Sequence, residues 1–256
     1  MVQNSSADNW DDHWQELSKD IYFNTPGVKY RWEGIKKLLN LDSLSPKINL
    51  IDFGCGTGKL IEYFLNQYNG ISVKGTDNSN VGLEIAKRKL PQVDFFQADL
   101  CSKQAEFNQS YLNWATHATC SEVLEHLDDP VLFLKNAGKF LRKGAKLVIS
   151  VPGGPMSTFD HQVGHRKHYT RKILEAELIQ AGYKVDKIAC SGFPFHNLYR
   201  LAFILRGEAI HKDAKHQEEG HGRFVSAVMN CFYFLFKFNL FNSSFGWVIL
   251  AKASLP

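Results

Sequence analysis

The chain has 256 residues, 44% of them apolar, which suits one α/β domain with an appendage and a core that needs no disulfide. Its net charge is only +4, with 26 acidic residues among 30 basic ones, so a nucleic acid is not the expected partner. The five cysteines show no CxxC spacing and the first residues lack a basic and then apolar leader, so we expect a cytoplasmic protein with reduced thiols.

Tryptophan is concentrated before the first predicted strand. Trp10, Trp14 and Trp32 are three of the five tryptophans in the chain. Rings of this size normally become buried when a protein folds. These tryptophans are compatible with a helical segment that packs on the edge of a sheet.

Residues 48–58 carry a strong signal. The apolar run 48–53 predicts a buried strand, and glycines then occupy alternate positions. Alternating glycines let the backbone adopt positive φ and bring its N–H groups close to a ligand. Helical spacing returns over 59–65, so the predicted order is strand, glycine turn and helix. This order indicates a turn that binds a cofactor.

The spacing of the glycines separates two kinds of cofactor turn. A dinucleotide fold has the pattern G-x-G-x-x-G, whereas here the third glycine comes one position earlier. Asp52 would repel a pyrophosphate but attract a sulfonium or ammonium ligand. The run Asp52-Phe53-Gly54-Cys55-Gly56-Thr57-Gly58 resembles the first motif of class I S-adenosylmethionine-dependent methyltransferases. The resemblance implies cofactor contacts from Asp52, Gly54, Cys55, Gly56 and Gly58.

The next two predicted strands also end near a carboxylate. The second strand ends at Asp77, which we assign to the ribose diol of the cofactor because a carboxylate can accept two hydrogen bonds. Asn78 beside it is a further candidate contact. The third strand ends near Asp99 and Leu100, which we assign to the amino group and a ring nitrogen of adenine. The alternative for Asp77 and its neighbours is capping of the following helix.

Residues 118–130 carry the most specific motif in the sequence. It is similar to the C-x-E-x-L-E-H-x-x-D-P pattern of the methyltransferase branch that contains the ubiquinone-pathway O-methyltransferases. The resemblance places Ser121 and Glu122 near the methionine end of the cofactor. Glu122, Glu125 and His126 follow i, i+3 and i+4 spacing and would share one face of a helix. The resemblance associates this trio with a divalent metal, but we expect polar packing around the cofactor and no metal.

A helix, a glycine turn and a fifth strand are predicted over 133–152, followed by a histidine-rich loop, 159–172. The loop resembles the G-H-x-R-x-Y-(S/T) signature of methyltransferases that tailor glycans and small molecules. We choose His165 as general base because the ordinary pKa of histidine lies near working pH, with His161 and His126 as reserves.

The same loop offers two candidate substrate contacts, Arg166 and Tyr169. A structural alternative stays open for the whole loop, in which its histidines pair with Asp160 or with backbone carbonyls. In that case Thr170 caps the predicted helix 171–181.

The last third of the chain is the least typical of the family. A sixth strand is predicted over 183–190 and the last one over 245–251, with helices 195–212 and 224–238 between them. A polar tract, 211–221, separates the two helices. The second helix is too short and too interrupted to span a bilayer. We expect the interval to cover an apolar substrate or to form a dimer contact, while core packing and contact with a membrane surface stay open.

The resemblance implies a Rossmann-like, doubly wound α/β sheet of seven strands, six of them parallel and the last antiparallel. It also implies an N-terminal helical lid over the cofactor, in which Trp10, Trp14, Tyr22 and Tyr30 take part and Tyr22 touches the substrate. The expected units are a helical segment or lid, 1–47, an S-adenosylmethionine-binding core, 48–192, a helical insertion, 193–244, and the last strand, 245–256.

The function that follows is transfer of a methyl group from S-adenosylmethionine to an oxygen of a small molecule or sugar, with S-adenosylhomocysteine as product. Nitrogen and carbon are less favoured acceptors. Three alternatives stay open: a degenerate methyltransferase that acts as a binding partner, a dehydrogenase, and a methyltransferase of nucleic acids or proteins. A homodimer is compatible with the chain.

Overall fold

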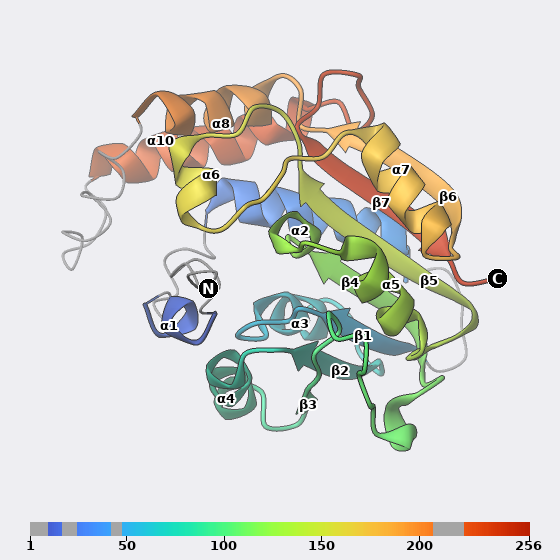
Figure 1. The fold of residues 1–256 in the computed structure, drawn as a ribbon. Coiled ribbons are helices and arrows are strands. Elements are labelled where there is room, and N and C mark those ends of the chain that lie inside the picture. Colours follow the sequence, from blue (N-terminus) through green and yellow to red (C-terminus); the bar gives the residue numbers. More distant parts are fainter. Residues whose placement is uncertain (1–9, 17–24, 42–47, 207–222) are drawn as a thin grey trace, which may run out of the picture.

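The computed structural model describes residues 10–16, 25–41, 48–206 and 223–256 (Figure 1). Their strands form one seven-stranded sheet in the order β3-β2-β1-β4-β5-β7-β6. The strands are β1 Asn49–Phe53, β2 Ser72–Asp77, β3 Asp94–Gln97, β4 Ala115–Ser121, β5 Leu141–Pro152, β6 Lys184–Ser191 and β7 Val248–Ser254.

The sheet has the predicted mixed topology. The pairs β1–β2, β1–β4, β2–β3 and β4–β5 are parallel, whereas β7 is antiparallel to both β5 and β6. β6 therefore runs in the direction of β1 to β5, and the last strand is inserted between β5 and β6. The prediction of six strands in one direction and an antiparallel last strand is confirmed, although β7 begins at Val248 and not at Phe245.

Helices cover both faces of the sheet (Figure 1). The α-helices are α1 Trp10–Glu16, α2 Pro26–Leu39, α3 Lys59–Leu65, α4 Asn80–Lys89, α5 Pro130–Gly138, α6 Thr158–Gln162, α7 Arg171–Gln180, α8 Phe195–Arg206 and α10 Arg223–Leu235. Three short 3-10 turns are η3 Gln109–Tyr111, η4 Leu124–His126 and η5 Phe236–Phe238. The predicted helix 195–212 is described as far as Arg206, and the polar tract 211–221 lies outside the described residues.

The core consists of two apolar layers, one on each side of the sheet. One layer contains Phe53, Phe140 and Leu174, all fully buried, from β1, the segment before β5 and α7. The other contains Ile35 from α2 and Phe64 from α3. Both faces of β1 are covered, so all five of its residues are buried, including the polar Asn49 and Asp52.

Side chains at the strand ends start several helices. Ser79 accepts the Gly82 N–H at the start of α4, and Thr170 accepts the Ile173 N–H at the start of α7. The predicted Thr170 cap is therefore confirmed. These caps fix where the chain leaves the carboxyl edge of the sheet, which is the edge that carries the glycine turn. No helix in the described ranges combines the length and apolar character needed to cross a membrane.

Candidate active site

The glycine turn directly follows β1 and leads into α3. Gly54, Gly56 and Gly58 have φ values of +71°, +50° and +76°, a region that side chains with a Cβ rarely adopt. Space is also limited: a Cβ on Gly54 would lie 2.4 Å from Val123 Cγ2, and one on Gly56 would lie 2.4 Å from Trp14 Cζ2. The predicted strand, turn and helix are confirmed, and the turn presents bare backbone to its surroundings.

Asp77 at the end of β2 holds this turn. Its Oδ2 accepts the Gly56 N–H at 2.8 Å and its Oδ1 accepts the Ser79 N–H at 2.9 Å. Burial raises the pKa of the Asp77 carboxyl, while these backbone hydrogen bonds oppose the rise. An ionised carboxylate has about four lone-pair positions, so Asp77 keeps acceptor capacity for a ligand hydroxyl.

Asp52 lies buried inside the sheet and is hydrogen-bonded to a neighbouring strand. It is buried in β1, paired in register with Thr119 of β4, and its Oδ1 accepts the Thr119 hydroxyl at 2.6 Å. Burial raises the pKa of Asp52 to about 7. The expected attraction between a fully charged Asp52 and a cationic ligand is therefore weak, because near neutral pH the carboxyl is only about half ionised. Its visible role is to join β1 to β4.

The residues assigned to adenine and ribose follow the ends of β2 and β3. Asp77 is in register with Gln97, the last residue of β3, so the segments after the two strands start side by side. Asp99 is exposed and its Oδ1 accepts the Cys101 N–H at 2.8 Å. Leu100 is buried, and the carbonyl of Asn78 accepts a hydrogen bond from Gln97. Thus Asn78, Asp99 and Leu100 border the same edge as the turn.

Helix α1 lies on the glycine turn. Trp14 covers Gly56 and also approaches Gly82 of α4. Asp11 Oδ1 accepts hydrogen bonds from the Ser79 hydroxyl at 2.5 Å and from the Val81 N–H at 3.3 Å. α1 therefore packs over the expected cofactor edge and not on the rim of the sheet. This favours the lid interpretation for Trp10 and Trp14.

The other two aromatic residues assigned to the lid have different positions. Tyr30 belongs to α2, where its hydroxyl lies 2.6 Å from Ser191 Oγ and its ring stacks on His196 at 5.4 Å between centroids. It joins α2 to the end of β6 and to α8. Tyr22, the remaining lid and substrate candidate, lies outside the described residues.

The segment after β4 carries a strained acidic residue. Glu122 has a φ of +55°, an uncommon conformation for a residue other than glycine. Its Oε1 accepts the Ser150 hydroxyl at 3.1 Å, and its Oε2 lies 3.4 Å from Arg31 Nε of α2. The Ser121 hydroxyl lies 2.9 Å from Ser150 Oγ. These contacts hold Glu122 beside the turn, since Val123 next to it touches Gly54.

Glu122, Glu125 and His126 would share one face only on a helix, and the structure does not form that helix. Only Leu124–His126 are helical, as the single 3-10 turn η4, and Glu122 precedes it with positive φ. The structure instead groups Glu125 and His126 with His165, with one ligand atom of each lying within 4.8 Å of the others. Such a group can hold a divalent ion, but it is not the trio that the sequence indicated.

Glu125 is the most unusual member of this group. Its side chain is fully buried, and neither carboxylate oxygen has a hydrogen-bond partner among the residues that the structure describes. Burial raises the pKa of Glu125 well above its ordinary value, which favours the neutral carboxyl. The His126 ring lies 4.7 Å from the Trp10 ring and 4.7 Å from the His165 ring, in edge-to-face contacts. α1 and the histidine loop therefore meet at His126.

His165 is held in a cluster of the loop that follows β5. Its Nδ1 lies 3.2 Å from His168 Nε2, and both rings face Asp160. Burial, together with the neighbouring His126, lowers the pKa of His165 to about 3. Burial opposes ionisation of Asp160, but hydrogen bonds from Arg200 of α8 and from Ser157 hold the pKa of that carboxyl below its ordinary value. His165 is thus neutral beside an ionised Asp160.

The other candidates in the loop are placed less favourably. His161 is exposed on α6. Arg166 Nε donates to the His126 carbonyl at 2.7 Å and lies 3.1 Å from Asp128 Oδ1. Tyr169 is buried, with its hydroxyl 3.2 Å from the Leu124 carbonyl and 3.0 Å from Glu177 Oε2. Arg166 and Tyr169 therefore tie the loop to η4, and this geometry favours a structural role over the predicted contact with substrate.

Sequence reasoning missed three members of the site. Arg31 and Arg200 come from α2 and α8, far from any motif, and no spacing pattern indicates that they meet Glu122 and Asp160. His168 stands within the loop that was singled out, and its proximity to His165 at i, i+3 was the available signal.

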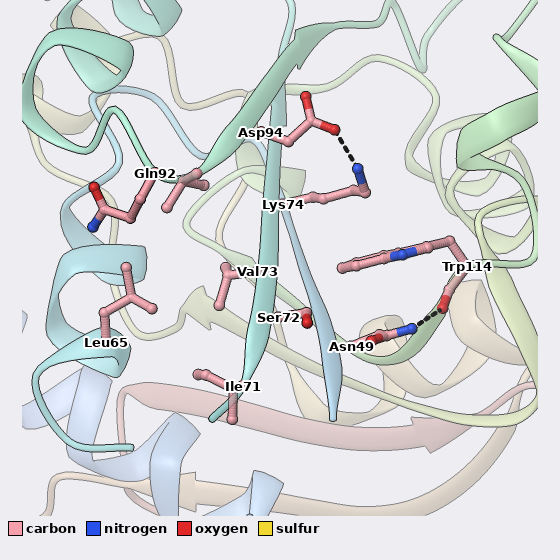
Figure 2. Close-up of a pocket in the computed structure, with 10 residues that line it drawn as sticks. Asn49, Leu65, Ile71, Ser72, Val73, Lys74, Gln92, Asp94 and Trp114 are labelled. Atoms are coloured by element: carbon pink, nitrogen blue, oxygen red, sulfur yellow. Dashed lines mark hydrogen bonds and ion pairs between the residues drawn. The ribbon is translucent and has the colours of Figure 1, made fainter. Parts of the chain in front are cut away.

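A hollow of about 380 Å³ lies at the opposite edge of the sheet (Figure 2). Asn49 and Ser72, at the beginnings of β1 and β2, line it together with Trp114 and the Lys74–Asp94 ion pair. Because the glycine turn follows the other end of β1, this hollow is separate from the site described above.

The chain matches a family model described as a methyltransferase domain over residues 28–188. A trans-aconitate 2-methyltransferase of Variovorax paradoxus (strain S110) is 28% identical over 171 residues, which are 65% of this chain and 60% of that protein. A ubiquinone biosynthesis O-methyltransferase of Nitrosomonas europaea is 32% identical over 114 residues, which are 43% and 46% of the two chains. The matched region is less than two thirds of either relative.

Solved structures resemble the fold at low sequence identity. A Haemonchus contortus phosphoethanolamine N-methyltransferase 2 bound to S-adenosylhomocysteine superposes with a TM-score of 0.63 and 17% identity, covering 98% of this chain and 60% of that one. The [4+2]-cyclase SpnF has a TM-score of 0.61 and 18% identity, covering 90% and 81%. Since one of these is described as a cyclase, the shared fold does not by itself define the reaction.

The chain belongs to the class I S-adenosylmethionine-dependent methyltransferase family. The family model covers more than half of the chain, and the mixed seven-stranded sheet and the glycine turn agree with it.

Proposed function

We propose that this chain is an active methyltransferase that binds S-adenosylmethionine along the carboxyl ends of β1, β2 and β3. The observation that carries the proposal is the contact between the bare glycine turn and the half-buried Asp77, whose carboxylate lies 2.8 Å from Gly56 N. The turn would offer backbone to the donor, and Asp77 would accept the ribose hydroxyls with its remaining lone pairs. Asn78, Asp99 and Leu100 border the same edge and would contact the nucleoside.

Helix α1 is the proposed lid of this site. Trp14 lies so close to Gly56 that a single added Cβ would collide with it. A donor that contacts the turn must therefore displace the Trp14 ring or lie against its face. Either movement would also change the environment of His126, because Trp10 of the same helix packs edge-on against that ring.

The proposed acceptor is an oxygen of a small molecule or sugar, and the low pKa of His165 favours the more acidic members of this class. Methyl transfer from a sulfonium requires alignment with the acceptor and, for a hydroxyl, removal of its proton. His165 would accept that proton, since it is neutral and has a lone pair at every working pH. A pKa of about 3 makes it a weak base. We therefore expect either an acceptor whose hydroxyl ionises readily, such as a phenol, or a carboxylic acid, which is already ionised at neutral pH and needs no base.

The names of the relatives support this acceptor class. One is named for trans-aconitate and the other as an O-methyltransferase of ubiquinone biosynthesis. A divalent ion is not needed for this proposal. The second candidate function, a degenerate methyltransferase that only binds a partner, is disfavoured because the three glycines and Asp77 keep the geometry that binding of a donor requires.

Calorimetric titration and a transfer assay test the proposal together. We expect saturable binding of S-adenosylmethionine and S-adenosylhomocysteine, no binding of NADH, and transfer of a labelled methyl group to a phenol or carboxylic acid from a panel of acceptors. Absence of heat with both adenosyl ligands would contradict the proposal. Binding without transfer to any class of acceptor would instead support the non-catalytic alternative.

A further inference from the structure

His165 is held by its neighbours through one of its two ring nitrogens. Its Nδ1 lies 3.2 Å from His168 Nε2 and 3.8 Å from Asp160 Oδ1. Within the described part of the chain, the hydrogen bond of the ring is made by Nδ1, and Nε2 makes none. A neutral imidazole carries its proton on one nitrogen and a lone pair on the other. The contacts of Nδ1 therefore decide whether Nε2 can act as a base.

The proton order of His168 follows from a backbone carbonyl. His168 Nδ1 lies 3.1 Å from the Gly154 oxygen, which can only accept a hydrogen bond, so this nitrogen carries a proton. The His168 side chain is 4% exposed, and its Nε2 lies 3.7 Å from Asp160 Oδ2, outside hydrogen-bond distance. A second proton on Nε2 would thus bury a cation without a hydrogen bond to a carboxylate. Burial lowers the pKa of His168 for this reason, and the neutral ring keeps a lone pair on Nε2.

The two rings then have one consistent arrangement. Because His168 Nε2 has a lone pair, the 3.2 Å contact is a hydrogen bond in which His165 Nδ1 donates and His168 Nε2 accepts. With its proton on Nδ1, the neutral His165 has its lone pair on Nε2. The Asp160 carboxylate, kept ionised by hydrogen bonds from Arg200 and Ser157, supports this order because its negative charge faces the Nδ1 proton.

The backbone fixes the carbonyl that sets this order. Gly153 forms a parallel bridge with Tyr169. The residues next to them in the chain, Gly154 and His168, are thereby brought close together. Gly153 also donates its N–H to the Trp247 carbonyl at 2.8 Å, and a Cβ on Gly154 would lie 2.6 Å from Trp247 Cγ. Gly154 is therefore packed between the histidine loop and the segment before β7.

We propose that His168 is a positioning residue for methyl transfer: by accepting the proton on His165 Nδ1, it leaves the lone pair of His165 on Nε2, where the acceptor hydroxyl gives up its proton. The role of Nε2 rests on the proposed function, whereas the proton order of the two rings is a property of the chain alone.

This order of the rings accounts for the movement of one proton. As the oxygen of the acceptor hydroxyl takes the methyl group and the carbon–sulfur bond of the donor breaks, the hydroxyl proton passes to His165 Nε2. His165 is then an imidazolium with protons on both nitrogens, and its charge faces Asp160. Loss of the Nε2 proton to water restores the neutral ring. His168 keeps its own protonation state throughout, so it acts through His165 and not on the acceptor.

Nitrogen NMR of the chain with isotope-labelled histidines tests the proton order, because ring nitrogens with and without a proton have well separated chemical shifts. The signals of His165 and His168 are assigned by their loss in His165→Ala and His168→Leu, and the exposed His161 serves as the reference for an imidazole in water. We expect a proton on Nδ1 and a lone pair on Nε2 in both rings. A proton on His165 Nε2, or protons on both nitrogens of His168, would overturn the inference.

Two variants of His168 separate positioning from packing. His168→Leu fills the space but cannot accept a hydrogen bond, so the proton of His165 should be shared between its two nitrogens. His168→Gln offers a side-chain oxygen as acceptor and should return the proton to Nδ1. With a phenol as acceptor, kcat should fall roughly tenfold in His168→Leu and recover in His168→Gln, with the KM for the donor unchanged. An unchanged proton order of His165 in His168→Leu, or equal losses of kcat in the two variants, would reduce His168 to a packing role and overturn the inference.

The two measurements also separate this inference from the proposed function. The NMR spectra are recorded without donor or acceptor, and binding of S-adenosylhomocysteine checks the folding of each variant. The expected proton order together with an absence of methyl transfer would contradict the proposed function, and with it the role of Nε2. Methyl transfer to a phenol with the opposite proton order would overturn the inference and leave the proposed function standing.

Discussion

Replacing Gly56 by alanine tests whether the lid helix really lies on the cofactor turn. Gly56 has a φ of +50°, and an added Cβ would lie 2.4 Å from Trp14 Cζ2 and 2.7 Å from Trp14 Cη2. Two costs follow. The left-handed backbone costs about 1–2 kcal/mol for a residue with a Cβ. The collision with the ring, which must move or be expelled, costs about 1–3 kcal/mol more. We expect Gly56→Ala to reduce the free energy of unfolding by about 2–5 kcal/mol.

A double-mutant cycle separates the two costs. In the Trp14→Ala background the collision is absent, so Gly56→Ala should cost only the backbone strain, about 1–2 kcal/mol. The expected coupling energy between the two sites is therefore about 1–3 kcal/mol. Gly70→Ala is a matched control, because Gly70 has a φ of +78° but no atom within 4 Å of its added Cβ. Its cost should be the same in both backgrounds.

The assay is urea unfolding followed by far-ultraviolet circular dichroism, which does not depend on the removed tryptophan. Titration with S-adenosylhomocysteine on the same samples reports whether the turn still binds. A cost of Gly56→Ala that is equal with and without Trp14, within about 0.5 kcal/mol, would refute the packing of α1 on the turn.

Three further perturbations test the site. Asp77→Ala should weaken S-adenosylhomocysteine binding in calorimetry by about 1.5–3 kcal/mol, the range for a lost charged hydrogen bond. Asp94→Ala, at the other end of β3, is the control and should leave the affinity unchanged. Equal affinities of the original chain and both variants would remove Asp77 from the site. With a phenol as acceptor, His165→Ala should lower the rate of methyl transfer by roughly 10²–10⁴ with cofactor affinity kept, and His161→Ala, on the exposed side of α6, should not. A near-normal rate for His165→Ala with that acceptor would return the residue to a structural role. Burial lowers the pKa of His196 to about 3, below its unfolded value, so its contribution to stability is complete above about pH 6.5 and is lost as the pH falls toward 3. Between pH 4 and 6, roughly, His196→Gln should therefore reduce the slope of unfolding free energy against pH by up to about 1.4 kcal/mol per unit, and parallel stability curves would contradict the burial of a neutral His196.

The fold could be predicted because its signals are local. An apolar run followed by alternating glycines and a helical pattern specifies a strand, turn and helix without knowledge of distant residues. Asp77 ends β2 as predicted, and Thr170 caps α7. Repetition of these signals along the chain fixed the order of the strands in sequence, and the family resemblance supplied their order in the sheet.

The site was predicted less completely because its decisive contacts are not local. Arg31 meets Glu122 and Arg200 meets Asp160 only after α2 and α8 pack against the sheet. Spacing misled at Glu122, since i, i+3, i+4 implies a shared face only if the segment is helical, and the positive φ of Glu122 breaks that condition. Asp52 is buried, as the predicted strand implied, but its hydrogen bond with Thr119 of the neighbouring strand β4 could not be read from the sequence.

The structure of the chain with S-adenosylhomocysteine bound is the most direct test of the central claim. The account predicts the ribose hydroxyls at hydrogen-bond distance from the Asp77 carboxylate, the amino-acid end against the turn 54–58, and the Trp14 ring displaced from Gly56 or stacked on the ligand. A ligand bound elsewhere, with Trp14 and Asp77 still closed over the turn, would contradict it.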